Sequence, residues 1–209
     1  MIAITFLLLF VQIGTAQSAA SPLDRLRAKV PVGPVTNVVS EQLAGQYSSS
    51  SEELRKRVGS FLDGDDLYLF PNGTYIYCEW ADIEPYTVRD KGTWVFADGI
   101  LTLTSDSEIT WDPETDRKYV VVYRMSHSKE IFLVGIERAL PRFEEEASND
   151  PEFTLLLVGK ARVKPLNQAT ANKLKAKLFR ESWHPEYFLG SKNKEQPPKQ
   201  TSRPCNAQQ

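Results

Sequence analysis

The feature that most constrains the fold is a β-hairpin signal in the first half of the chain. Residues 67–70 and 74–80 are rich in aromatic and β-branched side chains, as strands are, and only a short turn separates them. That turn contains Asn72-Gly73. Asn and Gly tolerate the positive φ angles that a tight hairpin turn requires, so the two runs are predicted to pair as antiparallel strands.

The same pattern follows a second time. Residues 92–96 and 100–104 are again strand-like, and Asp98-Gly99 lies between them. Two hairpins in succession predict an antiparallel meander.

Further strands are expected in the second half of the chain. Residues 118–125 and 130–136 indicate a third strand pair, and residues 153–163 indicate a long last strand. Short helices are expected at 51–61 and 140–148. At least seven short strands with little intervening helix predict a mainly β protein, an antiparallel meander that closes into a small barrel or forms a sandwich.

A C-terminal amphipathic helix is predicted over residues 170–181. One side of the helix is apolar and the other is basic: Ala171, Leu174 and Leu178 against Lys173, Lys177 and Arg180. An apolar stripe needs a partner in water, so we expect the helix to pack on the barrel through it.

The N-terminus has the pattern of a secretory signal peptide. Residues 1–13 are almost wholly apolar, and small residues follow them up to Ala20. The run is too short to span a bilayer, so we expect a cleaved signal and a secreted or periplasmic protein. The expected organisation is a signal peptide over 1–20, a linker over 21–42, one domain over 43–190 and a disordered tail over 191–209.

Charge is unevenly distributed along the chain. From Lys160 onward there are eleven basic and three acidic residues, whereas the preceding part has fourteen basic and twenty-four acidic residues. The basic C-terminal segment is a candidate for contact with an anionic surface. Glycines do not form a phosphate-binding loop, and we expect no nucleotide cofactor and no nucleic-acid partner.

Four short segments together resemble the small lipocalin-like, or calycin, barrels of exported proteins. They are Gly45-Gln46-Tyr47, residues 69–75, residues 92–94 and residues 99–103. The resemblance covers about the first half of the domain, and Tyr47 stands where lipocalins usually carry Trp on the first strand. It implies a lipocalin-like barrel.

Motifs for metal binding and catalysis are missing from the sequence. His127 and His184 have no partner at metal-ligand spacing, and no H-E-x-x-H or G-x-S-x-G motif occurs. The acidic segment that begins at Asp112 has Arg117 and Tyr123 where a calcium-binding EF-hand loop needs Gly and Glu. We therefore predict no metal site, no cofactor and no recognisable catalytic residue.

The only two cysteines are Cys78, in a predicted strand, and Cys205, in the tail. A disulfide between them would close a very long loop onto a segment with no reason to dock. Two unpaired thiols are expected.

Aromatic side chains are the main functional signal. In a small barrel they could line a cavity for an apolar ligand, and they could equally fill the core with no cavity left. The candidate ligand-binding residues are Tyr75, Tyr77, Trp80, Trp94 and Phe96.

The first functional hypothesis is a non-enzymatic module that binds a small apolar molecule or another protein. The alternative is a hydrolase whose carboxylates cannot be recognised in the sequence. An open, aromatic-lined mouth without buried carboxylates would favour the binder. Two converging, partly buried carboxylates in a cleft would favour the hydrolase.

Overall fold

A computed structural model describes residues 20–33, 35, 38–106, 118–124, 130–146 and 150–181. Nearly all of the predicted signal peptide and the whole of the predicted tail lie outside these residues. So do His127, His184 and the acidic segment from Asp112 to Asp116. No helix among the described residues has both the length and the apolar character needed to cross a bilayer.

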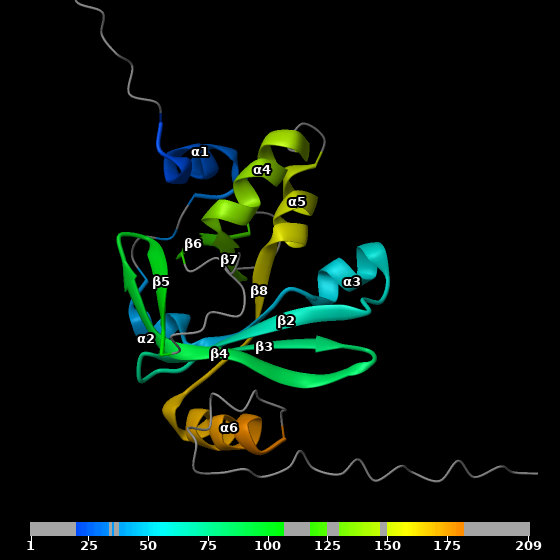
Figure 1. Cartoon of the computed structure of the whole chain (residues 1–209). Helices are drawn as coiled ribbons and strands as arrows, with labels where there is room; N and C mark the ends of the chain where they lie inside the picture. The colour runs from blue at the N-terminus through cyan, green and yellow to red at the C-terminus, as the bar shows by residue number, and fades with distance from the viewer. Residues whose placement is uncertain are drawn as a thin grey trace, which may run out of the picture.

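Eight antiparallel strands form a closed barrel, in which each strand pairs with its neighbour in sequence and β8 pairs with β1 (Figure 1). The strands are β1 (Gly45–Ser48), β2 (Asp63–Leu69), β3 (Thr74–Ala81), β4 (Glu84–Ala97), β5 (Ile100–Ser105), β6 (Lys118–Tyr123), β7 (Ile131–Gly135) and β8 (Gly159–Pro165). The predicted mainly β meander is confirmed, and of the two forms expected the barrel is the one observed.

The two predicted hairpins form at the predicted turns. Phe70 N–H donates to Thr74 C=O at 2.8 Å, and Gly73 has a φ of 77°. In the second hairpin, Asp98 and Gly99 have φ angles of 53° and 78°. Both central residues of that turn are thus left-handed, which matches the twist of the flanking strands.

Strand β4 is longer than the sequence indicated. It begins at Glu84, eight residues before the predicted start at Gly92, and pairs with β3 along its first part and with β5 along its second. A Cβ at Gly92 would lie 2.0 Å from Thr104 O, so only glycine permits this close approach between β4 and β5.

Six helices accompany the barrel in the described residues. They are α1 (Pro22–Lys29), α2 (Ser40–Leu43), α3 (Glu52–Val58), α4 (Ile136–Glu146), α5 (Pro151–Val158) and α6 (Gln168–Glu181). Helices α3 and α6 confirm predictions. Helix α4 begins directly after β7, four residues before the predicted start of a helix at residue 140.

Two predicted segments need correction. The expected linker over 21–42 contains α1, which begins at a Ser21 cap followed by Pro22 and buries Leu26 completely. The expected strand over 153–163 is the helix α5 followed by β8. Asp150 caps α5, accepting a hydrogen bond from Phe153 N–H at 2.9 Å. The capping residues start a helix in each segment, although the local composition had indicated a linker in the first and a strand in the second.

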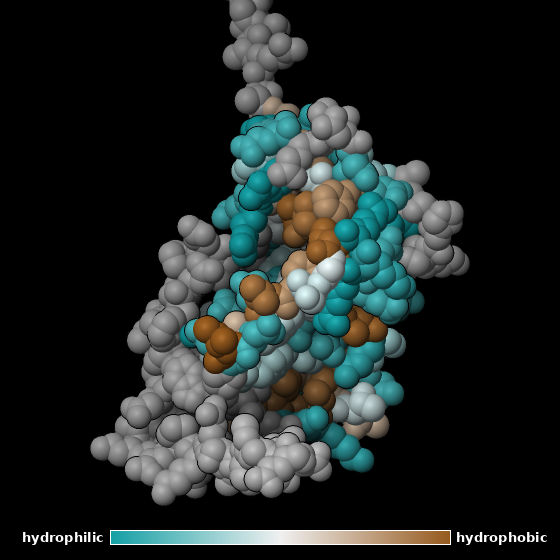
Figure 2. Space-filling model, turned by 90° about the vertical axis from the view of Figure 1, so that its right-hand side faces the viewer, coloured by the Kyte–Doolittle hydropathy of each residue, from teal (hydrophilic) through white to brown (hydrophobic). Residues whose placement is uncertain are grey.

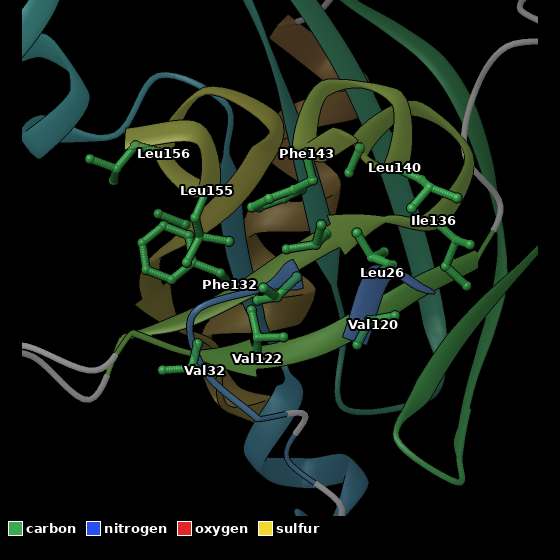
Figure 3. Packing of buried hydrophobic residues seen from close by; sticks show 14 of the residues in the cluster. Leu26, Val32, Val120, Val122, Phe132, Ile136, Leu140, Phe143, Leu155 and Leu156 are labelled. Carbon is green, nitrogen blue, oxygen red and sulfur yellow. The ribbon is translucent and has the colours of Figure 1, made fainter. Parts of the chain in front are cut away.

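Helices α1, α4 and α5 cover the outer face of β6, β7 and β8 (Figure 1). Figure 3 shows this layer, in which Leu26 of α1 and Phe143 of α4 lie over Val120 and Phe132 of the sheet. This face of the barrel is therefore closed to solvent.

On the other side of the barrel, α6 covers the outer face of β2, β3 and β4 (Figure 1). Its Ala171 and Leu178 are buried and Leu174 is partly buried, all against a cluster that includes Ile76 and Cys78. The basic residues on the opposite side of the helix are exposed, as predicted: Lys173, Lys177 and Arg180.

Candidate functional site

A cavity of about 720 Å³ lies at one mouth of the barrel. Its walls come from β2, β3, β4, β6, β7 and β8 and from α3, α4 and α5. Figure 2 views the side of the molecule that carries α3 and the tips of β2 and β3, where clusters of apolar atoms lie among polar ones.

The interior of the barrel changes character along its length. On β2, Leu69 and Leu67 belong to the interior core, and the next residue on the same face is Asp65. On β3, Tyr77 lies opposite Leu67, and Glu79, the next residue on that face, lies opposite Asp65. Because side chains alternate along a strand, the inward positions change from apolar to polar as the strands reach the mouth. The far end is a filled core and the near end is an open cavity.

An ion pair between Asp65 and Lys160 forms the floor of the cavity. Lys160 is 8% exposed and is the one buried lysine among the described residues. The Ser49 hydroxyl accepts a hydrogen bond from Asp65 N–H at 2.9 Å, and Ser49 N–H donates to Asp65 C=O at 3.0 Å. Asp65 lies on β2 and Lys160 on β8, so their ion pair joins these two strands across the floor of the cavity.

The pKa of Asp65 is lowered. Burial alone would raise it, but the Lys160 ammonium and the hydrogen bonds that the carboxylate accepts from Lys160 and Tyr77 lower it more strongly. Asp65 is therefore ionised at neutral pH, which keeps the pair charged on both sides.

Tyr77 connects two carboxylates. Its hydroxyl donates to Asp65 Oδ2 at 2.8 Å and lies 3.4 Å from Glu79 Oε1. Burial and the neighbouring Asp65 raise the pKa of Tyr77, so the phenol stays neutral. Glu79 is also held by Arg89, whose Nε is 2.7 Å from Glu79 Oε2.

Apolar side chains form the upper walls. The indole of Trp80 lies across Gly64, where a Cβ would be 2.5 Å from the ring. Leu54 of α3, Phe61 and Leu157 of α5 face the cavity from the helical side, and Leu157 remains 41% exposed. Charged side chains also line the cavity beyond its floor, so its walls are both apolar and charged: Asp63, Glu84, Arg138 and Arg142 belong to the lining.

The five candidate aromatic residues are divided between the core and the cavity. Tyr77 and Trp80 line the cavity, whereas Tyr75 and Trp94 are buried in the filled interior and Phe96 packs against it. Tyr75 donates to Asp90 Oδ2 at 2.5 Å, and Trp94 Nε1 donates to Phe70 C=O at 3.0 Å. Binding of a ligand by any of the five stays a prediction.

Sequence reasoning missed Asp65, Lys160 and Ser49. One signal was available, because Asp65 lies on the same strand face as Leu67 and Leu69. A carboxylate among apolar side chains that face inward indicates a polar partner inside the barrel. The partner itself, Lys160, could not be identified without the closure of β8 onto β1.

A second polar cluster lies outside the barrel under α6. Tyr86 donates to Asp66 Oδ2 at 2.7 Å, and the hydroxyls of Tyr68 and Tyr86 are 2.8 Å apart. Cys78 beside them is a free, completely buried thiol, as expected for that residue; Cys205 lies outside the described residues. These groups satisfy one another beneath the helix and do not line the cavity.

Comparison with protein-family models, with curated proteins and with solved structures finds no match to this chain. Among the described residues, no group of three or more His, Cys, Asp or Glu is arranged to hold a metal ion. The closed, eight-stranded antiparallel barrel is compatible with the expected lipocalin-like architecture.

Proposed function

We propose that this protein binds a small, mainly apolar molecule in the mouth of its barrel. The observation that carries the proposal is the cavity of about 720 Å³ above the Asp65–Lys160 pair. Its volume lies within the range of roughly 300–1,000 Å³ typical of small-molecule sites. Such sites combine apolar walls with convergent polar groups. Here Trp80 and Phe61 supply apolar contacts, and Tyr77 and seven charged residues supply the polar ones.

We extend the proposal to family and location. The segments that resemble lipocalin-like proteins lie on β1 to β5 of a meander barrel, which supports placing the protein among exported lipocalin-like barrels. The N-terminal pattern over 1–20 supports secretion or export to the periplasm. Mass spectrometry of the secreted product should show a new N-terminus between Gln17 and Ser21, and an intact Met1 would contradict export by cleavage.

A titration with N-phenyl-1-naphthylamine tests the binding proposal, because this neutral dye fluoresces when it enters an apolar site. The wild-type protein should enhance its fluorescence with saturation at one site. Leu157→Gln should weaken binding about ten-fold, because it puts an amide into the apolar wall. Val163→Gln is the matched control, since Val163 is another exposed aliphatic residue and does not line the cavity.

Equal effects of the two substitutions would contradict binding at the mouth. Failure of the folded wild-type protein to bind the dye would contradict the proposal as a whole. A protein partner or an anionic surface would then remain as non-enzymatic functions.

Hydrolysis is the second candidate, and one observation favours it. Asp65 and Glu79 converge on the Tyr77 hydroxyl inside the cavity. Both carboxylates have a cationic partner, however, and Lys160 lowers the pKa of Asp65, the opposite of what a proton-donating carboxyl requires. Turnover of 4-nitrophenyl glycosides or esters that is lost in both Asp65→Asn and Glu79→Gln would favour the hydrolase.

A further inference from the structure

The Asp65–Lys160 pair indicates what kind of head group a ligand carries. We infer that the ligand presents a neutral hydrogen-bond acceptor, a carbonyl oxygen of a ketone, aldehyde, ester or amide, to the Lys160 ammonium. This inference rests on the proposed function and specifies the chemistry of the same cavity.

Lys160 and Asp65 differ in the hydrogen bonds that they can offer a ligand. Within the described residues, the Lys160 ammonium bonds only to Asp65, so two of its three N–H groups have no acceptor among those residues. Its other contact is the ring of Tyr77, whose centroid is 5.7 Å from Nζ. Lys160 therefore has donor capacity at the floor of the cavity.

Asp65 has no corresponding capacity for a ligand. Its Oδ2 already accepts from Lys160 and from the Tyr77 hydroxyl. Its Oδ1 is enclosed by the protein, with no hydrogen-bond partner among the described residues. A head group that only donates hydrogen bonds would meet an occupied oxygen or one it cannot reach, so the pair favours a ligand that accepts.

Charge also favours a neutral head group. The lining of the cavity carries both signs of charge, with four carboxylates and three cations, and Arg89 pairs with two of the carboxylates, Glu79 and Glu84. The lining carboxylates are Asp63, Asp65, Glu79 and Glu84, and the lining cations are Lys160, Arg138 and Arg142.

A ligand anion would place a second negative charge beside Asp65, and a ligand cation would place a second positive charge beside Lys160. Either ion would also lose its hydration on entering the cavity. A carbonyl oxygen accepts from the charged donor without adding net charge, and hydrogen bonds to charged donors are stronger than neutral ones.

The apolar walls define the rest of the molecule. Trp80 and Phe61 border the cavity together with Leu157, which lies at the solvent side of the helical wall. A ligand with an aliphatic or aromatic body can therefore contact these side chains while its oxygen reaches the floor.

The test is competition against bound N-phenyl-1-naphthylamine at pH 7 with three ten-carbon compounds: 2-decanone, decanoate and decylamine. We expect 2-decanone to bind about ten-fold more tightly than either ion, because each ion loses its hydration and adds a like charge beside one partner of the Asp65–Lys160 pair. Tighter binding of decanoate or decylamine, or equal binding of all three, would overturn the inference. If the dye itself does not bind, the proposed function fails first, and the two failures are thereby distinguished.

A paired substitution provides the second measurement. Lys160→Met with Asp65→Asn removes both charges while leaving Asn able to accept from Tyr77. The affinity for 2-decanone should fall about ten-fold while the dye affinity changes less than about two-fold. Unchanged affinity for the ketone in this folded variant would also overturn the inference. If the variant does not fold, the competition series on the wild-type protein decides.

Lys175→Met is the matched control. Lys175 lies on α6, outside the barrel, and its ammonium lies near an aromatic ring, as that of Lys160 does. Its Nζ is 3.3 Å from Thr74 Oγ1 and 5.6 Å from the centre of the Phe70 ring. This substitution should leave the affinities for both the ketone and the dye unchanged.

Discussion

Removing the apolar contacts of α6 should destabilise the barrel much more than removing the charges of the helix. Leu178 is 7% exposed, and Leu174 is partly buried in the same cluster beneath α6. Truncation of a buried leucine to alanine costs about 2–5 kcal/mol. Leu178 packs at the barrel surface, so we take about 2–3 kcal/mol for it and about 1 kcal/mol for the half-buried Leu174.

The double variant Leu174→Ala/Leu178→Ala should therefore lose about 3–4 kcal/mol of unfolding free energy. Urea denaturation followed by circular dichroism measures this loss. With an m-value of about 2 kcal/mol/M, the midpoint should fall by about 1.5–2 M. Leu62→Ala is the control, because Leu62 is 71% exposed and its truncation should cost less than about 0.5 kcal/mol.

The comparison variant replaces the three exposed basic residues of α6 with glutamine: Lys173, Lys177 and Arg180. Exposed ion pairs contribute only about 0–1 kcal/mol each, so its midpoint should change little. If the glutamine variant were less stable than the double alanine variant, α6 would be held by charge and the packing argument would be refuted.

Three further predictions concern Asp65, Cys78 and the basic face of α6. Because the pKa of Asp65 is lowered by folding, its ion pair stabilises the fold above the unfolded pKa of about 3.9 and is lost as the pH falls through the folded value. The difference in Tm between wild type and Asp65→Asn should thus shrink below about pH 4, and a constant difference would contradict it. Burial raises the pKa of Cys78. In a Cys205→Ser background, its reaction with 5,5′-dithiobis(2-nitrobenzoate) at pH 8 should therefore be slow until urea unfolds the protein. A rapid reaction of the native protein would mean that α6 opens readily. We also predict that the basic face of α6 binds anionic surfaces. The protein should co-sediment with phosphatidylserine vesicles at low salt, and the glutamine variant should co-sediment less. Equal sedimentation of the two proteins would exclude the basic face of α6 as the binding surface.

Local sequence signals predicted the parts of the fold that depend on neighbouring residues. The turns at Asn72-Gly73 and Asp98-Gly99 require left-handed backbone, which few residue types supply, so both hairpins could be recognised. Helix α6 was recognisable because its apolar and basic residues alternate with helical period.

Helix α5 shows where this reasoning fails. Its sequence, Pro-Glu-Phe-Thr-Leu-Leu-Leu-Val, is apolar after the first two residues except for Thr154, and such a run has no period that separates a buried strand from a buried helix. The start signals Asp150 and Pro151 decided for the helix, and Gly159 ends it where β8 begins.

The candidate site was only half predictable. The sequence identified Tyr77 and Trp80 by their type and strand position, and both line the cavity. The floor depends on Asp65 and Lys160, which come from opposite ends of the domain and meet only because β1 pairs with both β2 and β8. Contacts made by barrel closure carry no local pattern, so the ion pair had to be observed.

The central claim, that a small molecule occupies the mouth, is tested most directly by two-dimensional NMR of the wild-type protein during titration with N-phenyl-1-naphthylamine. The account predicts that the largest amide shift changes map to residues around the cavity, among them Gly64, Tyr77, Trp80 and Gly159. Amides of α6 should move little, since the helix lies on the outer face of the barrel. Shift changes centred on α6, or scattered evenly over the surface, would contradict binding at the mouth.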